Sequence, residues 1–273
     1  MFKYIKYICS MYVFCSAILT IAQTDEIKIL KLGGNIVTKK QAKTGVARVN
    51  RIRNIAKEIS HYKGKLIVIH GAGSFGHPLA KKYKLDKSFS ATGAILTHNS
   101  VRALNEIIVK ALHKEGIKAI GIEPMSCVIC KNGRIKQMQT DQIKHLLNYG
   151  FVPVLFGDMV MDTHKKTCIL SGDQIITYLA KEFKVSTIGC GTSEDGVYDI
   201  HGKTIKHINL NNFDECKKSI KGSNYTDTTG GMLGKIKELL AIPGITSFIF
   251  NASKKGNITR FLQGKKTGTT ITT

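Results

Sequence analysis

Behind its N-terminal segment the chain alternates short apolar runs, several of which end in glycine, with longer segments of helical periodicity. The runs IKILKLGG (27–34), KLIVIH (65–70) and FVPVLFGD (151–158) predict buried strands. Apolar residues recur at helical spacing within 49–59 and 101–112. Such alternation predicts an α/β fold with a mostly parallel sheet and helices on both faces. Ligands of such folds bind at the carboxyl ends of the strands.

Local signals place further elements along the chain. Asn132-Gly133 predicts a tight hairpin turn. Ser171 and Gln174 have the spacing of a capping box and predict a helix that begins at this point. The last clear strands are expected at 185–191 and 247–252.

Composition restricts the class of partner. The 273 residues are 42% hydrophobic and suffice for a large α/β core, while 41 Lys and Arg against 19 Asp and Glu leave a net charge of +22. This excess favours anionic partners. The lysines are scattered and aromatic residues make up only 7%, so no nucleic-acid partner is expected. Seven cysteines, with one isolated CxxC at Cys127 and Cys130, indicate reduced thiols rather than a zinc site.

Residues 1–23 form a leader-like segment, in which two early lysines precede an apolar stretch of about 15 residues. A signal peptide, an organellar leader, a membrane anchor and a misassigned start codon all remain open. Cleavage after Ala22 would leave the domain whole, because the first core strand is expected at Ile27. Three N-x-S/T triplets are compatible with secretion, at Asn224, Asn251 and Asn257.

Two Gly-rich motifs resemble known phosphate-binding loops, and each lacks a residue that its loop type requires. GAGSFGH (71–77) follows a predicted strand and matches GxGxxG, the motif of dinucleotide-binding folds. Such a fold also needs an acidic residue about 20 positions later to bind the ribose, and the following segment has none there. TGGMLGKIK places Thr229 at the first glycine of a P-loop and Ile236 at its Ser or Thr, so it is not a Walker A motif. What remains is a set of Gly-rich turns with lysines nearby, which predicts a site for several phosphates.

The ordered motifs KLGG, SGDQI, DGVYD and the late GGM with its lysine resemble the amino acid kinase superfamily, which has a three-layer αβα sandwich. Within it, GAGSFGHPLAKKY, PVLFGD and TDTTGGMLGK are similar to the isopentenyl phosphate kinases. The resemblance runs from about Ile27 to the end of the chain. It implies ATP-dependent phosphorylation of isopentenyl phosphate to isopentenyl diphosphate, an acceptor-phosphate lobe at 24–165, a nucleotide lobe at 166–273, and a homodimer.

The resemblance also implies roles for single residues. Lys31, Lys40 and Lys235 would neutralise the phosphates of ATP, and Asp173 would orient the lysines, although an Asp at a helix start is otherwise only a cap. Mg²⁺ is expected on the ATP phosphates and waters. The nucleotide would be bound by Lys31, Gly33, Gly34, Asn35, Gly73, Asp195, Gly196, Val197, Tyr198, Gly231 and Lys235.

On the acceptor side, His77 is expected to bind the acceptor phosphate. A phosphate monoester has a second pKa near 6, so an anionic nucleophile is available without a general base. The acceptor phosphate is also expected to meet Ala72, Gly73, Gly157 and Asp158, and the segment from Phe89 to Leu104 is expected to line an apolar pocket for its tail.

Two departures from the family pattern concern the nucleotide. Asn35 stands where the family has Ser, and GTSE precedes DGVYD where TDV is commoner. The alternatives are a related kinase for a phosphonate or another small phosphomonoester, and a non-catalytic protein that binds phosphorylated ligands. A kinase that uses ATP is expected in the cytoplasm, and membrane association is expected only if the apolar leader is retained.

Overall fold

The computed structural model describes residues 26–39, 41–42, 44–220 and 231–273. The predicted leader, Lys40 and the triplet at Asn224 lie outside these residues. Within the described residues, no helix is both long and apolar enough to span a membrane.

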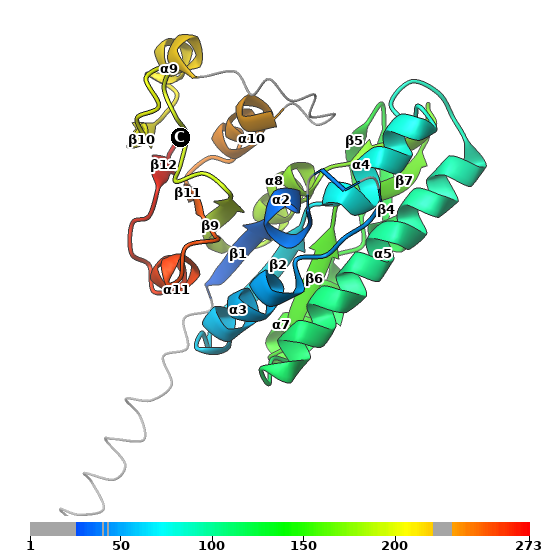
Figure 1. Cartoon of the computed structure of the whole chain (residues 1–273), viewed down its shortest axis with the longest axis horizontal. Coiled ribbons are helices and arrows are strands. Elements are labelled where there is room, and N and C mark those ends of the chain that lie inside the picture. Colours follow the sequence, from blue (N-terminus) through cyan, green and yellow to red (C-terminus); the bar gives the residue numbers. More distant parts are fainter. Residues whose placement is uncertain (1–25, 40, 43, 221–230) are drawn as a thin grey trace, which may run out of the picture.

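The centre of the molecule is an eight-stranded sheet (Figure 1). Its order is β10-β12-β11-β9-β1-β2-β6-β3, and the pair β11–β12 is antiparallel while the other neighbours are parallel. The mostly parallel sheet predicted from the alternating pattern is thus confirmed. Its strands are β1 (Ile27–Leu32), β2 (Lys65–His70), β3 (Ala119–Gly121), β6 (Val152–Phe156), β9 (Val185–Thr192), β10 (His207–Ile208), β11 (Thr246–Asn251) and β12 (Thr269–Ile271).

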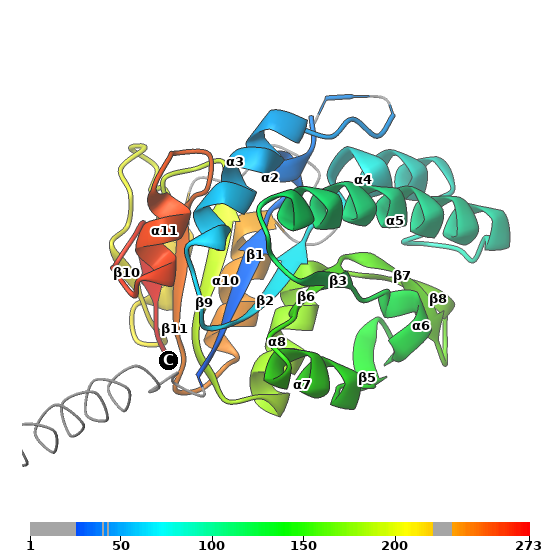
Figure 2. The same ribbon diagram turned by 90° about the horizontal axis from the view of Figure 1, so that it is seen from below.

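Helices cover both faces of this sheet (Figure 2). On β1, Ile27 and Ile29 point into one apolar core and Leu30 and Leu32 into the other, as a strand buried on both faces requires. One face carries α3 (Val49–Ser60), α4 (Gly73–Lys82), α5 (Ala91–Lys114) and α11 (Asn257–Leu262). The other carries α7 (Asp141–Asn148), α8 (Gly172–Glu182) and α10 (Gly231–Leu240).

A second, four-stranded sheet lies beside the end of the first, in the order β5-β4-β7-β8. Asn132 and Gly133, with φ of 53° and 80°, form the predicted turn between two of its strands. Asp162 accepts hydrogen bonds from the backbone N–H groups of both residues and of His164 and Lys165. One carboxylate therefore holds two neighbouring turns. The strands are β4 (Val128–Lys131), β5 (Arg134–Met138), β7 (Asp158–Asp162) and β8 (Lys166–Leu170).

Several expected elements are confirmed, and others differ in extent. The capping box of Ser171 and Gln174 is formed at the start of α8. The segment behind β2 is helical from Gly73 onward, with Pro78 inside the helix, where the sequence suggested a loop. The helix expected at 101–112 begins already at Ala91. Short elements without a clear pattern complete the fold, namely α2 (Gly34–Val37), α6 (Pro124–Cys127) and α9 (Phe213–Ser219).

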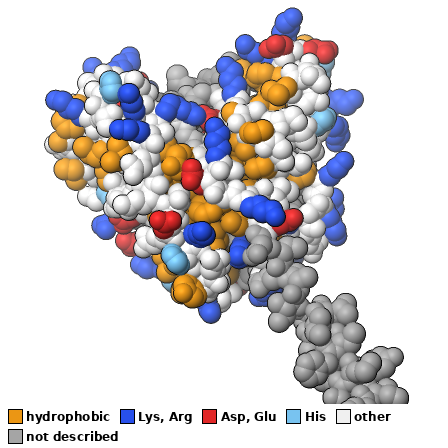
Figure 3. All heavy atoms as spheres, turned by 180° about the vertical axis from the view of Figure 1, so that it is seen from behind, with side chains coloured by type: hydrophobic (Ala, Val, Ile, Leu, Met, Phe, Trp, Pro, Cys, Tyr) orange, Lys and Arg blue, Asp and Glu red, His pale blue; other side chains and the backbone are white. Residues whose placement is uncertain are grey.

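Basic side chains are spread over the surface rather than gathered in one stripe on the face that Figure 3 shows. Acidic and apolar side chains lie between them. This face therefore offers no continuous basic track.

Candidate active site

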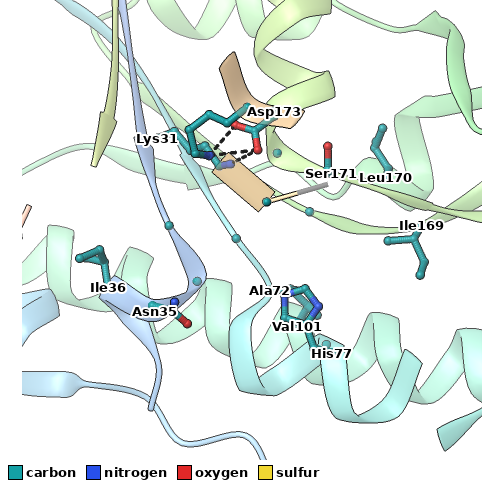
Figure 4. A pocket seen from close by; sticks show the side chains of 18 of the residues that line it. Lys31, Asn35, Ile36, Ala72, His77, Val101, Ile169, Leu170, Ser171 and Asp173 are labelled. Carbon is teal, nitrogen blue, oxygen red and sulfur yellow. Dashed lines mark hydrogen bonds and ion pairs between the residues drawn. The ribbon is translucent and has the colours of Figure 1, made fainter. Parts of the chain in front are cut away.

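A cavity of about 450 Å³ opens at the carboxyl ends of the central strands (Figure 4). The ends of β1, β2, β6, β8 and β9 and the starts of α2, α4, α8 and α10 contribute its walls. This is the edge at which the parallel topology predicts a ligand. Residues expected from the sequence are brought together here: Lys31, Gly33, Gly34, Asn35, Ala72, His77, Gly157, Asp158, Asp173, Gly231 and Lys235 all line the cavity.

A lysine–carboxylate cluster of Lys31, Asp173 and Lys235 forms one wall. Nζ of Lys31 lies 2.5 Å from Oδ2 of Asp173, and Nζ of Lys235 lies 3.0 Å from Oδ1 and 3.1 Å from Oδ2. The three side chains are only 8–12% exposed. Figure 4 shows Lys31 and Asp173 directed toward each other. The strand end of β1 and the starts of α8 and α10 thus deliver two cations to one carboxylate.

Burial and mutual charge shift the pKa of each group in the cluster. Burial lowers the pKa of Lys31 to about 8; Asp173 opposes this effect and Lys235 adds to it. Burial also acts against the charge of Lys235, but the attraction of Asp173 prevails and its pKa is raised. Burial would raise the pKa of Asp173, yet the two ammonium groups hold it well below its usual range. With both lysines protonated, the cluster carries an uncompensated positive charge that a phosphate can neutralise.

Glycines allow close backbone packing between the segment that joins β1 to α2 and the segment that precedes α4. A Cβ on Gly34 would lie 2.7 Å from the backbone N and Cα of Gly73, and Gly73 itself has φ of +51°. Thr38 ties the loops together, because its hydroxyl donates to the Gly34 carbonyl at 2.8 Å and accepts from the Ser74 amide at 3.0 Å. Loop packing therefore already requires these glycines, apart from any role toward phosphates.

Across the cavity from the cluster, His77 projects from α4 (Figure 4). The Gly-rich motif suggested that His77 lies at the end of a loop. The structure places it within this helix instead. Beside it, α5 contributes Thr97 and Val101, and β7 and β8 contribute Met159 and Ile169. The two α5 residues belong to the segment in which an apolar pocket was expected. This side of the cavity therefore combines an imidazole with a mainly apolar wall.

Asp158 also belongs to the cavity wall, but its carboxylate has no exposed surface. It accepts a hydrogen bond from Nδ1 of His98, at 2.9 Å to Oδ2 and 3.1 Å to Oδ1, and from the backbone N–H groups of Met125 and Met159. A ligand in the cavity would therefore meet the backbone of this turn. The sequence pattern did not single out His98, which lies inside the long helix α5.

Some of the residues predicted to bind the nucleotide lie outside the cavity lining. Gly73 and the turn Asp195–Tyr198 are not among the residues that line the cavity. Asp195 instead binds Asn251 and Lys254, and the buried Val197 donates its N–H to Thr269. In their place, the end of β9 contributes residues 192–194, the segment where the sequence departs from the family pattern.

The described residues hold no group of three or more His, Cys, Asp or Glu side chains that could bind a metal ion. Asp173 is already paired with two lysines, and Asp158 is fully hydrogen-bonded.

Comparison with known proteins places the chain among its relatives. Residues 26–251 match the amino acid kinase family. The chain is 36% identical over 263 residues to isopentenyl phosphate kinase of Methanothermobacter thermautotrophicus and 38% identical over 260 residues to that of Methanocaldococcus jannaschii, in each case over 98% of the relative. A solved isopentenyl phosphate kinase superposes with a TM-score of 0.78 at 32% identity, over 90% of this chain and all of that one. The chain therefore belongs to the amino acid kinase family and, within it, to the isopentenyl phosphate kinases.

Proposed function

We propose that the protein transfers the γ-phosphoryl group of ATP to isopentenyl phosphate and releases isopentenyl diphosphate and ADP. The observation that carries this proposal is a single cavity with a buried, net positive lysine–carboxylate cluster on one wall and His77 beside an apolar wall on the other. The first wall suits the transferring phosphate, and the second suits a phosphate monoester with a branched hydrocarbon tail.

The transfer needs charge neutralisation more than covalent catalysis. An oxygen of the acceptor phosphate attacks the γ-phosphorus, the bond from that phosphorus to the bridging oxygen breaks, and ADP leaves with the electron pair. Lys31 and Lys235 stabilise the charge on the transferring group, while Asp173 holds both ammonium groups in place. Lys40, outside the described residues, is proposed to stabilise the same charge.

The acceptor requires no general base in this scheme. The second pKa of a phosphate monoester lies near 6, so its oxygen is already anionic at pH 7. His77 binds this phosphate, together with the backbone at Ala72 and Gly157. The tail lies against Val101, Met159 and the neighbouring apolar residues.

Mg²⁺ enters the proposal as a companion of the nucleotide. It neutralises charge on the ATP phosphates and is held by them and by water rather than by a protein carboxylate cage. Gly33, Gly34, Asn35 and Gly231 line the cavity where these phosphates would lie. The turn Asp195–Tyr198 is proposed to lie beside the adenine and ribose, outside the phosphate cavity.

The test is turnover by the full chain with Mg-ATP and each of four acceptors: isopentenyl phosphate, dimethylallyl phosphate, fosfomycin and N-acetylglutamate. Release of ADP and the phosphorus NMR spectrum identify the product. We expect a diphosphate from isopentenyl phosphate with the highest kcat/KM. Absence of turnover with both isoprenoid phosphates at millimolar concentration would rule the proposal out. His77→Ala should raise KM for the acceptor and lower kcat, while KM for ATP stays near the wild-type value.

Assembly and location follow as further proposals. We propose a homodimer formed through the acceptor-binding lobe (24–165), which light scattering of the purified chain would test. Because ATP is the phosphate donor, we propose a cytoplasmic location. Microscopy of a tagged full-length chain would test it, and secretion in glycosylated form would contradict it. Attachment to a membrane is proposed only for a chain that retains its N-terminal apolar segment.

A further inference from the structure

The acceptor side of the cavity contains a buried carboxylate whose charge must be compensated before a phosphate can bind beside it. Asp158 follows Gly157 directly, both residues line the cavity, and the side chain of Asp158 is 0% exposed. Two like charges near one another in a poorly solvated site repel strongly. An acceptor phosphate dianion next to an uncompensated Asp158 would therefore bind weakly.

His98 supplies a compensating charge. Its Nδ1 lies 2.9 Å from Oδ2 of Asp158, and its side chain is 15% exposed. Two backbone N–H groups, from Met125 and Met159, also bind the carboxylate, but they bring no net charge. Among the described residues, the ion pair found for Asp158 is the one with His98.

The contacts continue from His98 toward the surface. Its Nε2 lies 3.8 Å from Oε2 of Glu123, and Oε1 of Glu123 lies 3.9 Å from a guanidinium nitrogen of Arg102. The charged groups that face His98 are thus Asp158 from β7, Glu123 from the turn before α6, and Arg102 from its own helix. The hydrogen bond that His98 donates to Asp158 raises the pKa of His98, burial lowers it, and the net shift is upward.

We infer that His98 is a positioning residue for the acceptor: as imidazolium it neutralises Asp158 and holds the Gly157–Asp158 turn where the acceptor phosphate binds. His98 is not among the residues that line the cavity, so it acts through Asp158 rather than by touching the substrate. The inference rests on the proposed function, because that function places a phosphate beside this turn.

Loss of the proton from His98 removes the charge but leaves the hydrogen bond. The neutral ring still donates from Nδ1 to Asp158, so the turn keeps its geometry. At pH values above the raised pKa of His98, the uncompensated carboxylate repels the acceptor. KM for the acceptor therefore rises with pH in that range, and KM for ATP does not follow it.

The decisive variant is His98→Asn, because an amide nitrogen can replace Nδ1 as the donor without carrying a charge. We expect KM for isopentenyl phosphate to rise about tenfold at pH 7, because the donor to Asp158 is retained but its positive charge is lost. Its dependence on pH above neutrality should disappear, while kcat and KM for ATP stay within about twofold of the wild type. His98→Ala, which loses the hydrogen bond as well, should raise the acceptor KM further.

His113→Asn is the matched control. His113 lies on the same helix, but its Nε2 binds the Ala119 carbonyl away from the cavity, so its replacement should leave both KM values unchanged. The inference is wrong if His98→Asn retains the wild-type acceptor KM and its pH profile. It is equally wrong if KM for ATP rises in parallel, because that result would indicate a general structural role.

A binding measurement separates this inference from the proposed function. NMR titration of the His98 ring is carried out with and without isopentenyl phosphate, and then with inorganic phosphate as the probe. A bound dianion should move the His98 titration to higher pH in the wild type. If this shift occurs without turnover, the proposed function fails and the inference stands. Turnover by the wild type without any shift would overturn the inference alone.

Discussion

Two buried carboxylates form part of the same cavity, and they are compensated in different ways. Asp173 is paired with two ammonium groups, whereas Asp158 is paired with one imidazole and two neutral backbone donors. The first arrangement leaves a surplus of positive charge. The second reaches neutrality only when its histidine is protonated. We infer that the side toward the nucleotide is built for constant cationic charge and that the acceptor side responds to pH.

The local structure reinforces this contrast. Asp173 lies in the first turn of α8, where the positive end of the helix dipole favours a negative charge. Asp158 begins β7, and its contact with the backbone of a helix is the hydrogen bond from the N–H of Met125 in the four-residue helix α6. The ionisation of Asp173 is therefore stabilised by its secondary structure as well as by its partners. The ion pair found for Asp158 among the described residues is the one with His98.

The largest effect is expected from Asp173→Asn. This change leaves Lys31 and Lys235 buried together without a counter-charge, and loss of one partner from a buried ion pair costs about 3–5 kcal/mol of unfolding free energy. We also expect kcat to fall by at least about 100-fold, as when a group that stabilises the transition state is lost. Urea denaturation and steady-state kinetics measure the two effects.

Asp158→Asn is the matched comparison. His98 can respond by losing its proton, so this variant should lose less unfolding free energy than Asp173→Asn. Equal losses of stability in the two variants would contradict the contrast between the carboxylates.

The lysine–carboxylate cluster was within reach of sequence analysis. Lys31 lies near the end of an apolar strand, Asp173 opens a helix with a capping box, and Lys235 lies in the helix that follows a Gly-rich turn. A parallel sheet brings these segments to one edge. The alternating pattern predicted the central sheet for the same reason. These features are local, and the topology then assembles them.

The pair of His98 and Asp158 could not be found in this way. The residues are 60 positions apart, and His98 is the eighth residue of a 24-residue amphipathic helix, in which a polar side chain usually faces solvent. The contact forms because α5 passes over β7, and that crossing is a property of tertiary packing. The beginning of α4 at Gly73 was also missed, because a Gly-rich stretch was taken for a loop. The close packing of Gly73 against Gly34 is a tertiary contact that the sequence pattern does not reveal.

Lys235→Met should separate activity from stability within the cluster. Folding raises the pKa of Lys235, so its loss should lower the unfolding free energy, but by less than Asp173→Asn does, because the remaining Lys31–Asp173 pair is balanced in charge. We expect kcat to drop about 100-fold because one cation is lost from the transferring phosphate. Repulsion by Lys235 also lowers the pKa of Lys31, so the residual activity should extend to higher pH. Lys237→Met, an exposed position on the same helix, is the control and should change neither property. A loss of stability in Lys235→Met as large as that in Asp173→Asn would contradict the idea of surplus charge.

The smallest effect expected is a pair of opposite pH dependences of stability. The pKa of Lys31 is about 8 in the folded protein against an ordinary value of 10.5, so the unfolded chain binds more protons between these values. The contribution of Lys31 to the unfolding free energy therefore increases as pH rises from about 8 to 10.5. The pKa of His98 is raised above 6.5, so its contribution to the unfolding free energy is fully present below pH 6.5 and is lost as pH rises through the folded pKa.

Urea denaturation at pH 5.5 to 10 measures both effects. The difference in unfolding free energy between wild type and His98→Asn should shrink across neutrality. The difference between wild type and Lys31→Met should change in favour of the wild type only above pH 8. If both differences changed in the same direction with pH, the two carboxylates would not be compensated in the different ways that the geometry indicates.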